Sequence, residues 1–343
     1  MLYNVPIESL EERYSARWNI GFPEEFVRLG VNFHTIYPDI IAPDAGKITR
    51  GQFLDVIRTN EFKALQLAEL MRLFDQGRIE DNDVILLHDL WFPGLEMLFY
   101  VRDGLGLKFK IAGLLHAGTY DPHDFLTQQG MERWAALIET SWWSEVDAVF
   151  VATHFHQQLL LNHRKDTLSV YVTGFPLFEK PQSVGPWEKQ NLVVFPHRLA
   201  PEKAPEEFAE IAKQCTTRLP GWEFVRTKDV CNTKPEYYAL LRQATIAVSC
   251  ARQETWGIAQ QEALFRGCLP IVPDRLSYQE LYDEVFRYQT LSQAADMIVD
   301  FAQHPGAVAR CSEFNATVNR CEVLSSKAVP EMVKIMRDKG WAV

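Results

Sequence analysis

The stretch SCARQETWGIAQQEALFRGCLPIVPDRLSYQE, residues Ser249 to Glu280, decides the fold of this chain. It follows an apolar run over 245–250 whose β-branched residues predict a buried strand. Apolar periodicity then predicts a helix over 256–265, ended by Gly267 at the C′ position, and a second buried strand over 269–273. This pattern is one βαβ unit of a parallel sheet. Because ligands of open α/β sheets bind where strands end, we expect a site between the first strand and the helix.

The loop between them carries groups suited to an anion. Backbone N–H groups at Thr255, Trp256 and Gly257 would suit a phosphate group, and Ile258 follows them in the candidate donor site. Two glutamates, Glu254 and Glu262, flank this turn with seven residues between them. A surface helix with solvated glutamates is the alternative interpretation of that spacing.

The spacing resembles the E-x7-E signature of retaining GT-B glycosyltransferases, those similar to glycosyltransferase family four. The residues in register with the family pattern are Glu254, Gly257, Glu262, Ala263, Gly267 and Pro270. The resemblance implies an α/β fold of the GT-B type, with two Rossmann-like domains facing each other across a cleft and a last helix crossing back to the N-terminal domain. It also implies a retaining, metal-independent glycosyltransferase. Glu262 would hold the ribose hydroxyls and Glu254 the hydroxyls of the donor sugar.

A second segment carries the same resemblance. PHRLAPEK, residues 196–203, is similar to the family's G-R-L-x-x-x-K turn, with His197 where Gly is usual. The resemblance implies Arg198 and Lys203 as pyrophosphate ligands. Fixed cations would stabilise the charge that develops on a departing nucleoside diphosphate, which we take to be UDP. The nucleotide sugar is then a co-substrate, and no metal or other cofactor is implied. Solvated basic residues on a loop are the alternative.

A segment rich in Pro, Gly and Ser predicts a domain linker over 176–190. We therefore expect an acceptor domain over 1–175 and a nucleotide-sugar domain over 191–324. A terminal amphipathic helix within 325–343 should pack on the first domain.

In the first domain, two buried strands are predicted over 83–88 and 110–115. Polar and aromatic residues follow both, as a substrate cleft requires. Asp89 and Trp91 follow the first strand, and His116, Tyr120 and Asp121 follow the second.

The resemblance gives roles to some of these residues. His116 corresponds in placement to the histidine that family members aim at the donor sugar, and a core histidine is the alternative. Asp89 and Asp121 are candidates to hold or deprotonate an acceptor hydroxyl. A turn residue before Pro122 is the alternative for Asp121.

The predicted first strand, over 2–5, leads into PIESLEERYS rather than the usual Gly-rich loop. This opening resembles those of glycosyltransferase-like proteins of tailed phages, some of which modify DNA bases. Glu8, Arg13 and Tyr14 would line the cleft at the end of the strand. An ordinary helix start with acidic first-turn residues is the alternative.

Composition limits the partners. The chain has 343 residues and a net charge of −10, which argues against non-specific coating of nucleic acid without excluding a local basic groove. No apolar run is long enough to span a membrane, and no basic amphipathic helix suggests a lipid surface. The six cysteines lack zinc spacing. We expect a cytoplasmic protein, in the host cytoplasm if it is phage-encoded.

These features together suggest transfer of a glucose- or arabinose-type sugar to a hydroxymethylated pyrimidine in duplex DNA, with the base extruded. The candidate phosphate contacts are Arg50, Lys63, Arg102, Lys108, Lys110, His163, Arg164 and Lys165. The main alternative is the same chemistry on a glycan or small molecule. A sugar-nucleotide epimerase and a non-enzymatic binding protein are further alternatives, and the oligomeric state stays open.

Overall fold

The computed structural model describes residues 1–10, 13–38, 55–165, 169–182 and 189–343. Contacts divide the chain into two units. The first comprises Met1–Phe178 with Ser326–Val343, and the second comprises Glu179–Ser325.

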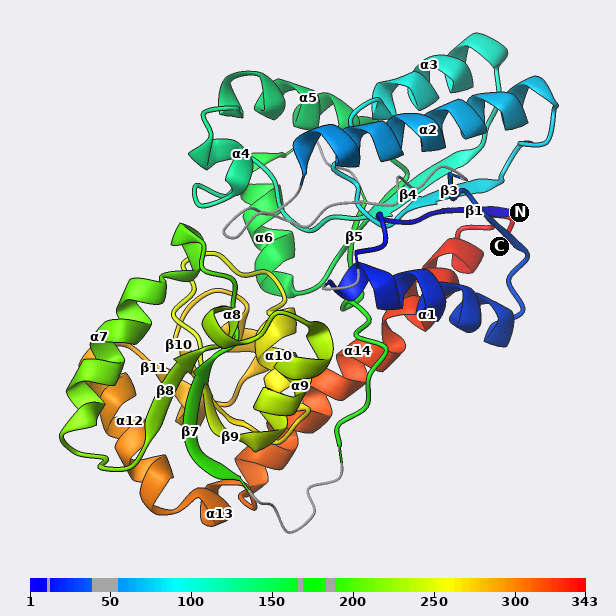
Figure 1. The fold of residues 1–343 in the computed structure, drawn as a ribbon. Helices are drawn as coiled ribbons and strands as arrows, with labels where there is room; N and C mark the ends of the chain where they lie inside the picture. Colours follow the sequence, from blue (N-terminus) through cyan, green and yellow to red (C-terminus); the bar gives the residue numbers. More distant parts are fainter. Residues whose placement is uncertain (11–12, 39–54, 166–168, 183–188) are drawn as a thin grey trace. The chain divides into compact units, whose positions relative to one another are not determined.

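The first unit is built on a six-stranded parallel sheet with the order β2-β1-β3-β4-β5-β6. Its strands are β1 (Leu2–Val5), β2 (Phe33–Thr35), β3 (Val84–Leu87), β4 (Lys110–Leu114), β5 (Ala148–Val151) and β6 (Val170–Val172). Its helices are α1 (Tyr14–Arg28), α2 (Val56–Asp75), α3 (Leu95–Leu105), α4 (Phe125–Gln128), α5 (Glu132–Glu145) and α6 (His154–His163). Figure 1 shows α2, α3 and α5 on one face of the sheet and α1 with the end of α14 on the other.

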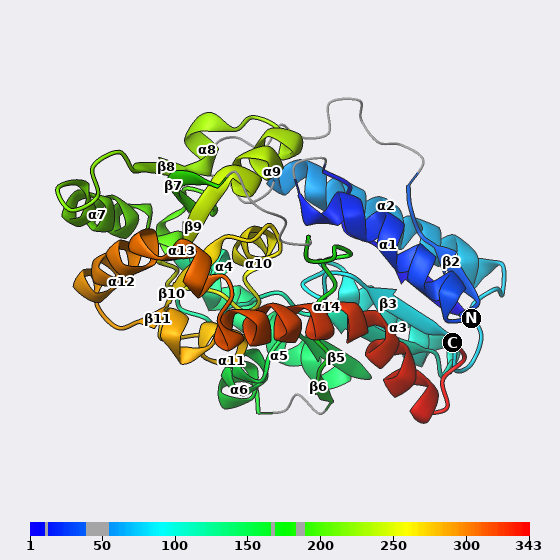
Figure 2. The same cartoon turned by 90° about the horizontal axis from the view of Figure 1, so that it is seen from below.

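The second unit has a five-stranded parallel sheet with the order β11-β10-β9-β7-β8. Its strands are β7 (Gln190–Phe195), β8 (Glu223–Arg226), β9 (Ala244–Val248), β10 (Leu269–Pro273) and β11 (Arg287–Tyr288). Its helices are η1 (Pro201–Lys203), α7 (Pro205–Thr216), α8 (Thr227–Val230), α9 (Lys234–Gln243), α10 (Ile258–Leu264), α11 (Tyr278–Leu281), η2 (Glu284–Phe286), α12 (Leu291–Gln303) and α13 (Pro305–Val308). In Figures 1 and 2, α7 and α12 lie together on one face, and α9 and α10 on the other.

The buried strands explain why the sheets are parallel. Every residue of β3, β5, β9 and β10 is buried, so both faces of these strands are covered by helices. The strands predicted over 2–5 and 269–273 have the expected bounds. Gly267 ends α10 as predicted: it takes a φ of +76°, and the amide of Cys268 donates to the carbonyl of Ala263 at 3.0 Å.

The last helix is longer than the sequence predicted. α14 runs over Ser312–Asp338 and contains Pro330, so the expected helix within 325–343 is its second half. That half belongs to the first unit. There, Arg337 Nη2 donates to the carbonyl of Leu29 at 3.0 Å, and the amide of Ala342 donates to the carbonyl of Asn82 at 2.9 Å. No helix in the described part of the chain combines the length and apolar character that a membrane crossing needs.

Candidate functional site

The loop before α10 starts the candidate donor site. Gly257 adopts the left-handed conformation, with φ +77°, and so α10 begins at Ile258 rather than at the predicted Trp256. The amide of Trp256 points at Oε1 of Glu254, at a distance of 3.5 Å, and its side chain is buried. This loop therefore folds back on the Glu254 carboxylate. The amide of Trp256, which the sequence suggested as a phosphate ligand, points at that carboxylate instead.

Glu254 pairs with a lysine from the loop after a neighbouring strand. β7 and β9 are adjacent and parallel, so the loops after their carboxyl ends meet at one edge of the sheet. Lys203 Nζ lies 3.1 Å from Glu254 Oε2 and donates to the carbonyl of Gln253 at 2.5 Å. Burial, the largest single influence, would raise the pKa of Glu254. The charge of Lys203 and the electrostatic influence of His197, with hydrogen bonds from Lys203 and the amide of Gly257, together outweigh it and hold that pKa below its ordinary value. Glu254 is therefore an ionised, nearly buried carboxylate.

His197 stands beside this pair. It is buried, and burial together with the charge of Lys203 lowers its pKa to about 3. The ring is therefore neutral. Its Nε2 atom has no hydrogen-bond partner among the described residues. The histidine that replaces the usual glycine thus adds bulk and a polar edge, without adding positive charge.

Arg198 lies on the same loop and is held by Glu202. Its Nε donates to Glu202 Oε1 at 2.8 Å, and a second guanidinium nitrogen contacts the same oxygen. About a third of the Arg198 side chain is exposed, at 32%. The guanidinium is therefore oriented by the protein yet accessible to an anion.

Glu262 sits in a polar cluster that the sequence did not reveal. Lys234 Nζ lies 2.7 Å from Glu262 Oε1, and the hydroxyl of Tyr238 donates to the same oxygen at 2.8 Å. The same hydroxyl lies 2.9 Å from Glu179 Oε1, and Arg266 pairs with Glu179 at 2.8 Å. The alternative interpretation, a solvated surface glutamate, does not hold for Glu262, since its side chain is only 6% exposed.

In the first unit, the loops after β3 and β4 lie side by side, because Leu87 of β3 pairs with Gly113 of β4. His116 Nε2 lies 2.8 Å from the carbonyl of His88. Since a carbonyl only accepts, Nε2 carries the proton. Burial lowers the pKa of His116, so its Nδ1 is an acceptor, which the hydroxyl of Tyr14 approaches at 3.4 Å.

Asp89 is fixed by a buried lysine. Lys63 Nζ donates to Asp89 Oδ2 at 2.8 Å and to the carbonyl of Trp91 at 2.7 Å. The amide of Trp91 returns a hydrogen bond to Asp89 Oδ1 at 3.1 Å. Asp89 and Trp91 are thus brought together at the carboxyl edge of the first sheet, as the sequence predicted.

Three other predicted residues of this unit, Asp121, Tyr120 and Glu8, have hydrogen-bond partners within the unit. Asp121 Oδ1 accepts the amide of His123 at 2.9 Å, as a turn aspartate does. Tyr120 does not line a surface: it is 2% exposed and its hydroxyl contacts His156 Nε2 at 2.5 Å. Glu8 accepts a hydrogen bond from Thr59 at 2.6 Å.

The start of α1 differs from the alternative interpretation of the opening segment, a helix start with acidic first-turn residues. Arg13 is the N-cap residue and Tyr14 the first helical residue, and the first turn contains no acidic residue. The ring of Tyr14 packs on Trp18 and stacks near His116, with centroid separations of 5.0 and 5.9 Å. Tyr14 therefore belongs with the His116 group.

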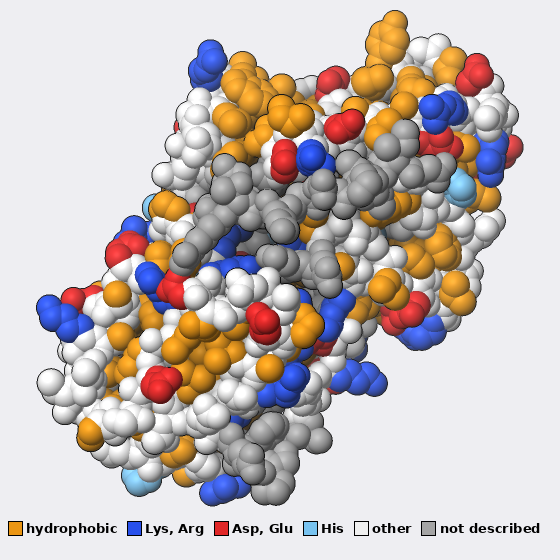
Figure 3. All heavy atoms as spheres, in the orientation of Figure 1, with side chains coloured by type: hydrophobic (Ala, Val, Ile, Leu, Met, Phe, Trp, Pro, Cys, Tyr) orange, Lys and Arg blue, Asp and Glu red, His pale blue; other side chains and the backbone are white. Residues whose placement is uncertain are grey.

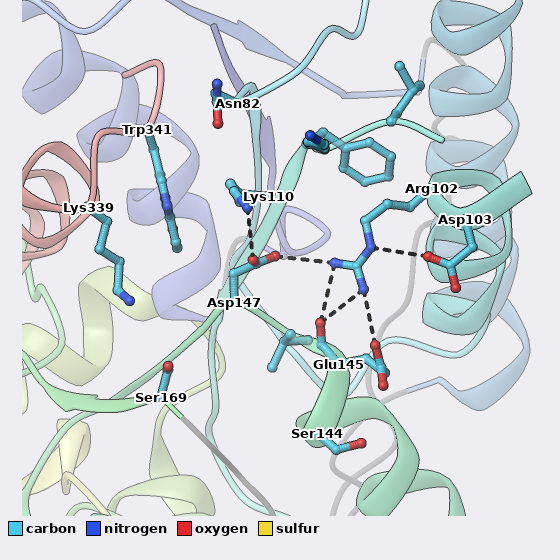
Figure 4. A pocket seen from close by; sticks show the side chains of 14 residues that line it. Asn82, Arg102, Asp103, Lys110, Ser144, Glu145, Asp147, Ser169, Lys339 and Trp341 are labelled. Carbon is cyan, nitrogen blue, oxygen red and sulfur yellow. Dashed lines mark hydrogen bonds and ion pairs between the residues drawn. The ribbon is translucent and has the colours of Figure 1, made fainter. Parts of the chain in front are cut away.

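Four of the predicted phosphate contacts are in ion pairs: Lys63, Arg102, Lys110 and Arg164. Arg50 lies outside the described residues, and Lys63 and Arg164 are in ion pairs with little exposure. Arg102 and Lys110 turn toward Asp147, in a hollow of about 660 Å³ at the opposite edge of the sheet (Figure 4). In Figure 3, apolar side chains gather over α3 and α5. Tyr100 of α3 and Leu137 of α5 are 82% and 74% exposed.

The comparisons support the fold. No protein-family model matches the chain. The sucrose-phosphate synthase of Thermosynechococcus elongatus superposes with a TM-score of 0.70 at 14% identity, over 98% of both chains. An α,α-trehalose-phosphate synthase (UDP-forming) from Burkholderia vietnamiensis gives a TM-score of 0.64 at 12% identity, over 98% of this chain and 96% of the other. These likenesses confirm the predicted α/β fold of the GT-B type.

A curated relative is similar to part of the sequence. The tRNA-queuosine alpha-mannosyltransferase of Drosophila melanogaster is 30% identical over 104 residues, which cover 30% of this chain. The match spans about a quarter of the relative, 26% of its length.

Proposed function

We propose that this chain is a retaining glycosyltransferase that moves a glucose- or arabinose-type sugar from a UDP-sugar to a hydroxymethylated pyrimidine in duplex DNA. The observation that carries the glycosyltransferase assignment is the Lys203–Glu254 pair, 3.1 Å apart at the carboxyl edge of the second sheet of a GT-B fold. Ligands of parallel α/β sheets bind at this edge. Charged side chains there would suit the diphosphate and the hydroxyls of a nucleotide sugar.

The donor is held by two kinds of charge. Arg198 and Lys203 provide positive charge for the diphosphate, and Glu202 orients the Arg198 guanidinium. The ionised Glu254 accepts hydrogen bonds from hydroxyls of the sugar, and Glu262 does so from the ribose. Lys234 and Tyr238 already bond to Glu262, so the ribose must share that carboxylate or replace one of them.

The transfer step needs no protein nucleophile. The bond between the anomeric carbon and the UDP oxygen breaks while the bond from that carbon to the acceptor oxygen forms on the same face. The acceptor proton passes to an oxygen of the departing phosphate. Arg198 and Lys203 stabilise the charge that develops on this leaving group.

The loops of the first sheet serve the acceptor side. Asp89, fixed by Lys63, accepts a hydrogen bond from the acceptor hydroxyl. His116, which by the family resemblance faces the donor sugar, is a neutral hydrogen-bonding group, because its Nε2 proton is committed to the carbonyl of His88 and its pKa is lowered. Trp91 offers an aromatic surface to a base. A hydroxymethyl group in duplex DNA would reach these groups only after base extrusion.

A nucleoside of RNA is a second candidate acceptor. The observation in its favour is the 30% identity over 104 residues to an enzyme named for mannosyl transfer to queuosine of tRNA. Both acceptors present a hydroxyl on a modified base within a polynucleotide, and the same donor site serves either.

Nucleoside mass spectrometry after a transfer reaction tests the proposal. Duplex DNA with hydroxymethylcytosine or hydroxymethyluracil is incubated with UDP-glucose or UDP-arabinose, alongside unmodified duplex and tRNA containing queuosine. A glycosylated hydroxymethylpyrimidine is the expected product, and the Glu254→Gln variant should yield none. Glycosylated queuosine alone would move the acceptor to RNA. Donor hydrolysis without either product would move it to a glycan or small molecule, and no turnover of any donor would overturn the glycosyltransferase assignment.

A further inference from the structure

The loops that hold Asp89 and His116 converge on one buried carboxylate. Glu139, on α5, has no exposed surface. Its Oε1 accepts the indole N–H of Trp91 at 3.0 Å and the amide of Thr119 at 2.7 Å. Its Oε2 accepts the hydroxyl of Thr119 at 2.5 Å and pairs with Arg164 at 2.8 Å. One side chain therefore joins the loops after β3 and β4 to the end of α6.

The chain leaves room for this contact at Gly118. A Cβ atom there would lie 2.8 Å from Glu139 Oε1 and 2.9 Å from the ring of Trp143. Both distances are shorter than ordinary contacts of a Cβ atom. Any side chain at position 118 would therefore push the backbone before Thr119 away from the Glu139 carboxylate. The glycine in the sequence is what permits this close approach.

Packing alone does not explain why a charged pair, Glu139 and Arg164, is buried at this position. A buried ion pair gains little over apolar packing of the same volume, because both charges lose their hydration. It does fix the orientation of whatever it binds, since each donor has one direction. Here the oriented groups are the Trp91 indole, which carries the aromatic surface, and Thr119, three residues after His116.

We infer that Glu139, paired with Arg164, is a positioning residue that holds Trp91 and the 116–119 loop in register for the acceptor base; the inference rests on the proposed function. Glu139 touches neither donor nor acceptor. Its removal shifts the two loops relative to each other and so weakens acceptor binding and alignment, whereas the donor residues on the second sheet keep their contacts.

The test compares Glu139→Gln with Asp147→Asn in the full chain. Asp147 is a matched control on the same sheet: it accepts the amide of Ile111 at 2.9 Å and pairs with Arg102 at 3.3 Å, at the opposite edge from the loops. For each protein we would measure KM for the modified duplex, the rate of transfer and the rate of UDP-sugar hydrolysis. Glu139→Gln should lower the ratio of transfer to hydrolysis by about 10- to 100-fold and raise the acceptor KM. Asp147→Asn should leave that ratio as in wild type.

A second pair of variants keeps the test decisive if Glu139→Gln folds poorly. Thr119→Val removes the hydroxyl but keeps the shape of the side chain at position 119, and it leaves Glu139 unchanged. Thr119→Ser keeps the hydroxyl. The valine variant should lose transfer relative to hydrolysis, and the serine variant should regain it. Equal ratios in Glu139→Gln, Asp147→Asn and wild type, or in the two Thr119 variants, would overturn this inference alone. A wild-type protein that neither hydrolyses nor transfers would overturn the proposed function and this inference with it.

Discussion

Lys203 and Glu254, separated by 51 positions in the chain, form an ion pair in which both side chains are nearly buried, at 8% and 15% exposure. The pair joins the two segments in which the sequence resembles the retaining glycosyltransferases. The sequence of neither segment predicts that Lys203 and Glu254 contact each other. Their meeting follows from the adjacency of β7 and β9, whose following loops share one edge of the sheet.

Replacing Glu254 with Gln should abolish UDP-sugar hydrolysis, because the uncharged amide cannot balance Lys203 or accept as strongly from the sugar hydroxyls. Breaking a buried pair also costs stability, about 3 kcal/mol at neutral pH. The folded pKa of Glu254 is below its ordinary value of 4.5, so its stabilisation is present above that pH and lost as the pH falls through the folded pKa. Urea denaturation of both proteins at pH 7 and pH 4 should show the difference shrinking at the lower pH.

The matched control for that variant is Glu331→Gln. Glu331 pairs with Lys334 at 3.5 Å on an exposed part of α14 and should affect neither hydrolysis nor stability. Hydrolysis by Glu254→Gln at the wild-type rate would remove Glu254 from the donor site.

Arg198→Ala should weaken UDP binding by about tenfold or more, the loss expected for a hydrogen bond between two charged groups. Isothermal titration calorimetry with UDP measures the effect. Arg218→Ala is the control, because Arg218 pairs with Asp296 at 2.7 Å elsewhere on the surface of the same unit. Dissociation constants that match in the two variants would argue that Arg198 serves only Glu202.

Acid should destabilise the protein through its buried histidines. Burial lowers the pKa of His88 to about 3 from an ordinary 6.5, so between these values the unfolded chain binds a proton that the folded chain does not. Stability therefore falls as the pH drops below about 6.5, by about 1.4 kcal/mol per pH unit for each such group. His88→Leu should reduce that slope in urea denaturation between pH 6.5 and 5. The exposed His154, replaced by Leu, should leave the slope unchanged, and equal slopes in the two variants would contradict a buried neutral His88.

Two glycines should respond to alanine in opposite directions. At Gly118 the new methyl group would meet Tyr120 at 2.6 Å as well as Glu139, so Gly118→Ala should destabilise the protein by about 1–3 kcal/mol. At Gly104, in α3, nothing lies within 4 Å, so Gly104→Ala should stabilise by about 0.5–1 kcal/mol through helix propensity. Thermal unfolding of the two variants checks both signs. A Gly118→Ala protein as stable as the wild type would show that the loop of Thr119 can move to accommodate the methyl group, contrary to this prediction.

Apolar periodicity predicted the parallel strands, because buried parallel strands are short apolar runs bounded by turns, whereas the GT-B type came from the family resemblance. The strands over 2–5 and 269–273 were predicted with their observed bounds from this pattern alone. The errors lie at helix ends, where local backbone decides. The helix expected from Trp256 starts at Ile258 because Gly257 is left-handed, and the terminal helix extends back to Ser312.

The candidate site was predictable only where a motif fixed the spacing. Glu254, Lys203 and Arg198 came from family-like segments. Lys234, Glu179 and Glu139 did not, because their roles depend on partners 28, 59 and 20 to 48 positions away. The one local hint was at Lys234, which begins a helix with a capping box between Thr233 and Glu236. A capping box locates a helix start without saying what its lysine will bind.

The hydroxyl of Tyr238 has one proton and two carboxylate neighbours, Glu262 at 2.8 Å and Glu179 at 2.9 Å. It can donate to only one of them at a time, so the two oxygens compete for it. A ligand hydroxyl that displaced Tyr238 from Glu262 would leave the Tyr238 hydroxyl to donate to Glu179, the first residue of the second unit.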